Sequence, residues 1–192
     1  MVQTLSLVVW WQIFHLVIAQ VLIFLMIRIE QRGNVQGVKC LILVRVLVYK
    51  MFLRALNLAK IPVLIAMIVT PIRFFLELAG LPENLIFIIG LLWLTLAFAV
   101  YWGIKLYNEK QPYLLILLSL IIFSPISRFT VFVVWWVDTK WSIGTHYGLY
   151  FDNWVQALLN HVVYGALVQI IPGFLLGSMT LAIMRYRKSV TK

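Results

Sequence analysis

The sequence predicts an all-α integral membrane protein, in which a bundle of about five transmembrane helices is joined by one basic amphipathic helix at the membrane surface. Of the 192 residues, 64% are hydrophobic and only 11% are charged, and the mean hydropathy is +1.01. A soluble domain has roughly half of its residues apolar and about a quarter charged. The chain therefore has too little polar surface to face water on all sides, and the composition indicates a lipid bilayer as its solvent.

The apolar residues are gathered in runs that match the thickness of a membrane. A helix needs about 20 apolar residues to cross a hydrocarbon layer about 30 Å thick. Four runs reach or exceed that length: 4–28, 84–107, 113–137 and 155–184. No basic segment precedes the first run, so we expect a retained span rather than a cleaved signal peptide. The last run is longer than a bilayer requires, and Pro172 near its middle is expected to kink it.

Residues 61–81 form a fifth, weaker candidate for a span. Two prolines and two charged residues interrupt its apolar sequence: Pro62, Pro71, Arg73 and Glu77. No linker or repeat divides the chain, so residues 1–192 are expected to form a single transmembrane domain.

The segment before that span, residues 36–59, carries a basic residue every four to six positions. Lys39, Lys50 and Arg54 fall on one side of a helix, and apolar residues cover much of the rest. This pattern indicates a helix that lies in the plane of anionic lipid headgroups at the inner face of the membrane. The alternative is a sixth span, in which each central Lys or Arg costs about 2.5–3.5 kcal/mol.

The distribution of positive charge predicts how the chain is oriented. With the N-terminus outside and the C-terminus in the cytoplasm, thirteen of the sixteen Lys and Arg residues fall on the inner side. Cytoplasmic loops of membrane proteins carry such an excess. The net charge of +10 is therefore attributed to membrane topology, and no nucleic-acid partner is expected.

Polar residues of several spans fall at one depth, in the outer half of the predicted bundle. Ionisable groups inside a bilayer normally face a bundle interior or a wet cavity. The sequence therefore predicts an outward-facing polar pocket for an anionic or polar small solute, with these candidate ligand-binding residues: Arg128, Asn160, His161, Tyr164, Gln156, Arg73, Glu77 and His15. Arg128 is the expected anion anchor.

An alternative interpretation is a polar network with only a structural role. Arg73 and Glu77 are i,i+4 neighbours that can neutralise each other. Arg128 can bond backbone carbonyls freed near Pro125, or extend toward the membrane surface. The sequence leaves both interpretations open.

The outer loop, residues 138–153, is rich in aromatic residues and glycine. It is either a lid over the pocket or part of an aromatic belt at the membrane interface, and the belt is favoured. The residues that would form the lid are Trp141, Tyr147, Tyr150 and Phe151.

No catalytic, cofactor or metal signature stands out. Four outer residues could be combined as metal ligands, Asp138, His146, Asp152 and His161, but no pair has the spacing that places two ligands on one helical face. The single cysteine, Cys40, excludes a disulfide framework. We therefore expect no metal, no cofactor and no catalytic residues, although an enzyme is not excluded.

Gly173 and Gly177 form a GxxxG motif on the last span. This spacing allows a second helix backbone to approach closely. The second helix belongs either to the same chain or to a partner membrane subunit.

Taken together, these features favour a small membrane protein that binds a ligand or takes part in transport. One alternative is a non-catalytic subunit of a larger membrane complex, docked through its glycines and its basic helix. A third possibility is a membrane enzyme that acts on a lipid-linked substrate, with His15, Glu77 or His161 as acid or base.

Overall fold

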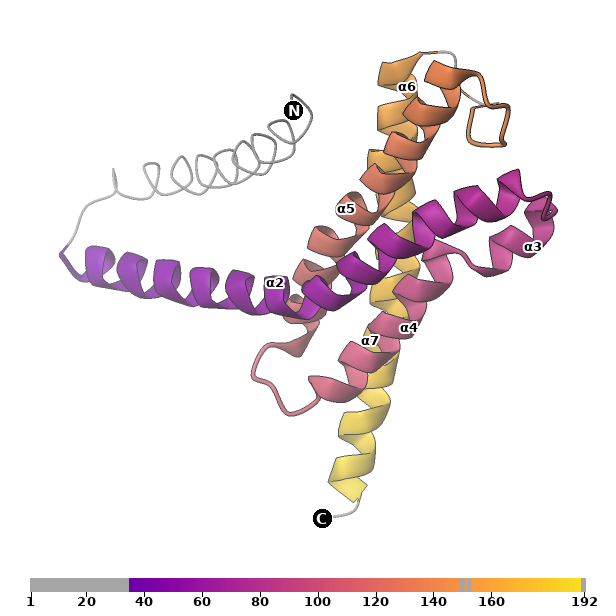
Figure 1. Cartoon of the computed structure of the whole chain (residues 1–192). Helices are drawn as coiled ribbons and strands as arrows, with labels where there is room; N and C mark the ends of the chain where they lie inside the picture. Colours follow the sequence, from indigo (N-terminus) through magenta and orange to yellow (C-terminus); the bar gives the residue numbers. More distant parts are fainter. Residues whose placement is uncertain (1–34, 149–150, 152, 191–192) are drawn as a thin grey trace. The chain divides into compact units, whose positions relative to one another are not determined.

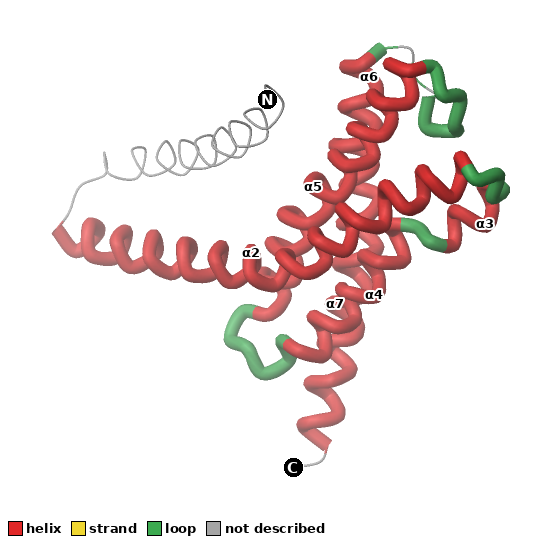
Figure 2. Tube along the Cα trace, in the orientation of Figure 1, coloured by secondary structure: helices red, strands yellow, loops and turns green. Residues whose placement is uncertain are grey.

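Helices make up all regular structure in residues 35–148, 151 and 153–190, the part of the chain that the computed structural model describes (Figure 1, Figure 2). The elements follow in this order: α2 (Val35–Leu78), α3 (Glu83–Ile88), α4 (Leu91–Lys105), α5 (Pro112–Trp141), α6 (Trp154–Leu158), the π-helix η1 (Leu159–Tyr164) and α7 (Gly165–Val190). The predicted all-helical class is confirmed for these residues.

Four long apolar stretches of helix can cross a membrane: Arg45–Leu78, Asn84–Lys105, Pro112–Trp141 and Trp154–Val190. They correspond to the predicted spans 61–81, 84–107, 113–137 and 155–184. The structure therefore confirms that the chain has several candidate membrane spans, four of them among the described residues. The predicted first span, residues 4–28, lies outside the described residues.

The chain divides into two compact units, residues 1–50 and residues 51–192. In the first unit, the described residues are 35–50, and all of them are helical. The second unit contains the remaining helices together with the candidate site.

Helix α2 differs from the sequence prediction in its length. A surface helix at 36–59 and a separate span at 61–81 were expected, but the structure has one helix of 44 residues that continues through Pro62 and Pro71. No glycine or other turn signal separates the two predicted segments, and Pro62 alone does not end the helix. Proline is tolerated within apolar membrane helices because neighbouring groups satisfy the backbone carbonyls that it frees.

A second difference is a break in the predicted span 84–107. The short helix α3 ends at Ile88, and α4 begins after Gly90, whose backbone is extended with φ −88° and ψ 148°. Gly90 therefore separates the short helix α3 from the longer helix α4.

Small residues bring α4 and α7 close together in the second unit. A Cβ built on Gly103 would lie 2.7 Å from the carbonyl oxygen of Gly177, closer than real Cβ atoms approach. A Cβ on Gly177 would lie 3.1 Å from the carbonyl oxygen of Ala99, and one on Gly173 would lie 3.0 Å from Leu120 of α5. The GxxxG motif thus packs against two helices of its own chain, and α4, α5 and α7 lie side by side (Figure 1).

The last span begins irregularly. Helix α6 passes directly into the π-helix η1, and η1 passes into α7, so that residues 154–190 are continuously helical apart from one widened segment. Pro172, where a kink was expected, lies inside α7. The irregular hydrogen bonding occurs instead at residues 159–164.

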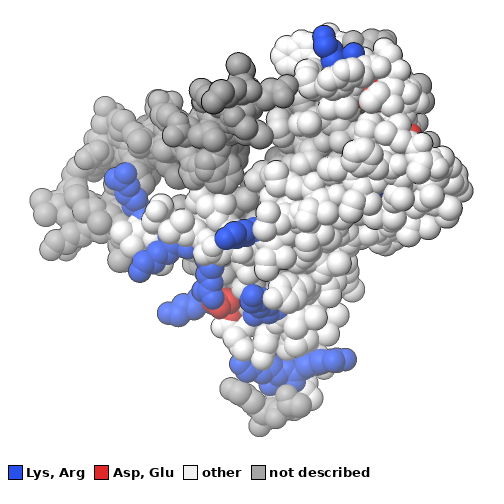
Figure 3. All heavy atoms as spheres, in the orientation of Figure 1, with Lys and Arg blue, Asp and Glu red and all other residues white. Residues whose placement is uncertain are grey.

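The two ends of the second unit differ in charge. At the end that we call the basic end, Arg54 and Glu109 form an ion pair, and Arg185 and Lys188 of α7 bond the turn that joins α4 to α5. Figure 3 shows Lys and Arg atoms gathered around one acidic side chain there. The opposite end, which we call the loop end, carries the segment 142–148 and the end of α2 at Leu78.

Candidate ligand site at the loop end

The loop after α5 is folded around one buried carboxylate. Asp138 is 1% exposed, and its side chain accepts hydrogen bonds from the backbone N–H groups of Gly144 (2.9 Å), Thr145 (3.2 Å) and Gly148 (2.7 Å) and from the Thr145 hydroxyl (2.7 Å). A Cβ on Gly148 would lie 2.6 Å from Asp138 Oδ2, so glycine is needed there. Four donors offset the cost of burying a charge. Asp138 therefore fixes the path of residues 142–148.

This loop is tied to the end of α2 through Glu77. The backbone N–H of His146 donates to Glu77 Oε1 at 2.6 Å, and the ring Nδ1 of His146 contacts Oε2 of the same carboxylate. Both side chains are mostly buried, at 17% and 15% exposed. The only carboxylate on the second half of α2 is thereby engaged by the loop.

The loop also places Tyr147 in the interior. Tyr147 is 4% exposed. The centroid of its ring lies 3.9 Å from the ring centroid of His146 and 6.3 Å from the ring centroid of Phe74. Burial raises the pKa of the Tyr147 phenol, and the net shift is upward. The positive charges of Arg73 and Arg128 oppose this shift, and the negative charge of Glu77 adds to it. The phenol is therefore neutral at physiological pH and lies within electrostatic reach of groups from α2 and α5.

Arg73 lies one helical turn before Glu77 and is only 9% exposed. Arg128 comes from α5 and lies against α7, since its Cδ and Nε atoms would be 3.0 and 3.2 Å from a Cβ on Gly165. Glycine at position 165 leaves the space that the Arg128 side chain fills. The charge of Arg73 acts on Arg128, so the two guanidinium groups lie within electrostatic range of each other.

His161 of η1 completes the group. Its ring meets the ring of Phe151 edge-on, with centroids 5.3 Å apart, and the charges of Arg128 and His146 act on it. The π-helix widens the turn that carries His161, and such segments frequently occur at functional sites.

We call the set Arg73, Glu77, Arg128, Tyr147 and His161 the arginine cluster. It draws its members from α2, α5, η1 and the loop. Among the described residues, four buried polar atoms of the cluster have no hydrogen-bond partner: Arg73 Nε, Arg128 Nε, Tyr147 Oη and His161 Nε2. Within the described residues, neither guanidinium forms a salt bridge.

An unsatisfied buried polar group costs about 1–3 kcal/mol, and more if it is charged. Native structures therefore rarely leave such groups without a partner, a water molecule or a ligand. Two guanidiniums and a neutral phenol carry hydrogen-bond donors, and the imidazole nitrogen donates or accepts according to its tautomer. This arrangement is chemically suited to an anion or another hydrogen-bond acceptor.

Three other predicted site residues lie on α6 and η1, and two of them are exposed. Tyr164 is 61% exposed, Gln156 is exposed, and the side-chain amide of Asn160 donates to the Gln156 carbonyl at 2.9 Å. Their spacing predicted that they share one face of a regular α-helix. The π-helix at 159–164 has more residues per turn, so residues at that spacing no longer lie on the same face. His15 lies outside the described residues.

The loop contributes residues that sequence reasoning did not place in the pocket. His146 and Asp138 were weighed only as metal ligands, and Tyr147 only as a lid or belt residue. Asp138 was detectable in part, because an acidic residue followed by several glycines and a threonine is a typical pattern for a folded turn. Nothing in the sequence indicated that His146 would meet Glu77, 69 positions earlier.

The aromatic residues of the loop end divide between the lid and belt interpretations. Tyr147 is buried and Phe151 packs against the core, as a lid requires. Trp141 and Trp154 are 63% and 62% exposed, as membrane-interface residues would be. Tyr150 lies outside the described residues.

Buried polar side chains continue from the cluster into the bundle. The Thr130 hydroxyl donates to Thr70 Oγ1 at 3.0 Å, and the Ser127 hydroxyl donates to Gln169 Oε1 at 3.2 Å. Ser124 Oγ and Gln169 Nε2 are buried and have no partner in the part of the chain that the structure describes. We call these residues the polar row; they join α2, α5 and α7 next to the arginine cluster.

Metal binding finds no geometric support in residues 35–148, 151 and 153–190. No three His, Cys, Asp or Glu side chains among them lie close enough together to hold an ion. The Asp138 carboxylate, one of the four weighed ligands, is occupied by the loop.

No protein-family model, no curated protein and no solved structure matches this chain. Its function must therefore be argued from its own residues.

Proposed function

We propose that this chain is a multi-pass membrane protein that binds a small anionic or polar solute at the arginine cluster, as a ligand-binding or transport-associated protein. The observation that carries the proposal is an imbalance of charge. Among the described residues, Arg73 and Arg128 lie within electrostatic range of each other, and the carboxylate of Glu77, one helical turn from Arg73, is already engaged by His146.

The imbalance has an energetic consequence. Removing an ion from water costs several kcal/mol in a real protein unless a counter-charge and hydrogen bonds compensate for it. Glu77 can balance one of the two guanidiniums, and a bound anion would balance the other. Arginine binds carboxylates and oxyanions through paired parallel N–H bonds, which makes those two classes the best candidates for the solute.

The proposed orientation places this site toward the outside. The basic end carries Arg54, Lys105, Lys110, Arg185, Arg187 and Lys188, and positive residues favour the cytoplasmic side. The loop end then faces out, with the C-terminus in the cytoplasm. An external N-terminus follows if residues 4–28 cross the membrane, as their length and composition favour.

The polar row supports a role in transport. Thr70, Thr130, Ser127 and Gln169 lie on the same three helices within about one turn of Arg73, Arg128 and Gly165, in a bundle where most side chains are apolar. Polar residues inside membrane bundles commonly mark solute or ion pathways. A solute that leaves the guanidiniums would meet these groups next.

The two other functions weighed from the sequence have less support. A docking role for the GxxxG motif is not needed, because Gly173 and Gly177 pack against α4 and α5 of the same chain. An enzyme would need a separable acid, base and nucleophile, and the described residues offer no such arrangement beside the Glu77–His146 pair.

Thermal unfolding of the detergent-purified protein tests the proposal. We would titrate it with sulfate, phosphate and succinate at constant ionic strength. A bound anion at 100 times its Kd raises the stability by about 2.7 kcal/mol, and at least one anion should raise the Tm of the native protein. Sulfate and phosphate also stabilise proteins by exclusion from the surface, so the increase must be compared with that of Arg128→Ala.

The variants separate binding from folding. Arg128→Ala should lose the anion-dependent part of the Tm increase, and Lys140→Ala, which removes an exposed cation at the same end, should retain it. Tyr147→Phe removes one hydroxyl from the cluster and should weaken binding in a protein that still folds. An equal increase in the native protein, Arg128→Ala and Tyr147→Phe would overturn the proposal.

A further inference from the structure

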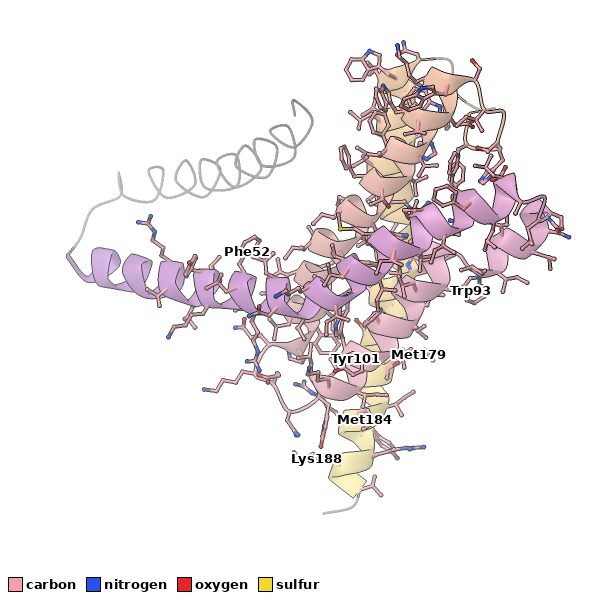
Figure 4. All side chains as sticks on the ribbon, in the orientation of Figure 1. Phe52, Trp93, Tyr101, Met179, Met184 and Lys188 are labelled. Atoms are coloured by element: carbon pink, nitrogen blue, oxygen red, sulfur yellow. The ribbon has the colours of Figure 1, made fainter. Side chains whose placement is uncertain are left out.

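Helices α5 and α7 pack against each other in opposite directions, and their contacts repeat along the chain. At the arginine cluster, Arg128 of α5 fills the space beside Gly165 of α7, with its Cδ atom 3.0 Å from a Cβ built there. Farther along, a Cβ on Gly173 would lie 3.0 Å from Leu120 of α5. Both helices advance by about two turns between these two contacts. Met179, labelled in Figure 4, lies beyond Gly173 on the part of α7 that leads to the C-terminus.

Polar side chains lie between these two contacts. The Ser127 hydroxyl lies 2.8 Å from the carbonyl oxygen of Ser124 and 3.2 Å from Gln169 Oε1, so α5 and α7 meet here as well. Ser124 lies one turn before Arg128 on α5, and Gln169 lies one turn after Gly165 on α7. We call Ser124 and Gln169 the middle pair. It lies one helical turn from the place where Arg128 contacts α7.

The middle pair is buried but not satisfied. Both residues are 0% exposed, and within the described part of the chain Ser124 Oγ and Gln169 Nε2 have no hydrogen-bond partner. Ser119, on the same helix, differs because its hydroxyl donates to the Leu115 carbonyl at 2.8 Å. Buried polar groups without a partner are costly and call for an explanation.

A single chemical group can satisfy both atoms. The Gln169 amide nitrogen is a donor only, whereas the Ser124 hydroxyl both donates and accepts. An alcohol hydroxyl could accept a hydrogen bond from Gln169 Nε2 and donate one to Ser124 Oγ. A second anionic group has less to gain, because the middle pair carries no charge.

We infer that the solute held by the arginine cluster carries a hydroxyl group that binds between Ser124 and Gln169. The solute is therefore a hydroxylated anion, such as a sugar acid or a sugar phosphate. This inference rests on the proposed function. The anionic group lies at Arg128 and the hydroxyl lies one helical turn away, roughly 5.4 Å along the bundle, so a carbon chain of several atoms must join them.

Isothermal titration calorimetry of the detergent-purified full chain tests the inference with matched anions. Gluconate and hexanoate share a carboxylate and a chain length but differ in their hydroxyl groups. Glycerol phosphate and propyl phosphate form the corresponding pair for phosphates. In at least one pair, the hydroxylated anion should bind about fivefold more tightly, the factor for one hydrogen bond of ordinary net strength. Sorbitol, which has hydroxyl groups but no charge, should not bind.

Variants of the middle pair locate the hydroxyl. Ser124→Ala and Gln169→Met each remove one partner of the hydroxyl and nearly preserve the side-chain volume. Each should weaken binding of the hydroxylated anion about fivefold and leave binding of its matched anion unchanged. Ser119→Ala removes another buried hydroxyl from α5 and should change neither affinity. The Tm of each variant without solute verifies folding.

The outcomes separate this inference from the proposed function. If neither hydroxylated anion binds more tightly than its matched anion, or if both middle-pair variants bind it as the native protein does, the inference is overturned, because the middle pair then holds only water. The proposed function still stands if the anions bind to the native protein and not to Arg128→Ala. If no anion binds to the native protein, both are overturned.

Discussion

The carboxylate of Glu77, near the end of α2, accepts a hydrogen bond of 2.6 Å from the backbone N–H of His146, 69 residues later in the chain. The same carboxylate contacts the ring of His146. This link ties the loop after α5 to α2 and brings Tyr147 beside the two arginines. The proposed site therefore depends on a loop contact as much as on the helices.

A double-mutant cycle on Glu77 and His146 should measure this link. Glu77→Gln and His146→Ala should each destabilise the protein, and the double variant should lose less than the sum, because the two residues form one interaction. We expect a coupling energy of about 0.5–3 kcal/mol, measured by chemical unfolding. Additive losses would mean that the pair does not form.

Asp138→Asn should loosen the loop more than its small change in size suggests. In the native protein each carboxylate oxygen accepts two hydrogen bonds. In asparagine, an NH2 group replaces one of the two carboxylate oxygens. In either orientation of the side chain, this NH2 group faces two loop donors whose hydrogen bonds it cannot accept. Hydrogen exchange of the amides of Gly144, Thr145 and Gly148 should become faster, while Thr139→Ala, an exposed neighbour, should leave it unchanged. Unaltered exchange in Asp138→Asn would contradict the assigned role.

Gly103→Ala should destabilise the bundle by overpacking. The new methyl group would lie 2.7 Å from the Gly177 carbonyl oxygen and 2.9 Å from Thr180 Cβ, so α4 and α7 must separate. Overpacking of this kind costs about 1–3 kcal/mol. Ala97→Leu enlarges an exposed residue of the same helix and serves as the control. The prediction fails if the two variants have the same Tm.

Cysteine labelling should report the proposed orientation. In a Cys40→Ser background, Lys140→Cys should react with a membrane-impermeant maleimide added to intact cells, and Lys110→Cys should react only after the membrane is opened. The asymmetry follows from the excess of positive charge at the basic end. The reverse pattern would invert the topology and place the arginine cluster on the cytoplasmic side.

Much of the fold followed from the sequence, for physical reasons. Apolar runs of the length of a bilayer predicted the helices at 84–107, 113–137 and 155–184 within a few residues. The continuity of α2 was missed because Pro62, next to a change from basic to apolar sequence, indicates a boundary, whereas a proline inside an apolar helix need not end it.

The site was less predictable than the fold. The spacing and depth of Arg73, Glu77, Arg128 and His161 suggested a shared level; in the structure the charges of Arg73, Glu77 and Arg128 act on Tyr147, and that of Arg128 acts on His161, and their role as a site stays a prediction. The grouping of Gln156 and Tyr164 assumed a regular α-helix, which the π-helix at 159–164 interrupts. The buried position of Tyr147 depends on hydrogen bonds between residues that are far apart in the sequence, and no local sequence pattern predicts such bonds.

The central claim is that Arg73 and Arg128 together hold an anion. A crystal structure of the protein grown with sodium bromide tests it directly, because the anomalous signal of bromide marks anion positions. We predict an anomalous peak within hydrogen-bonding distance of both guanidinium groups, with Tyr147 beside it. A structure in which Arg128 points toward lipid or a neighbouring molecule, with no peak near Arg73, would contradict the account.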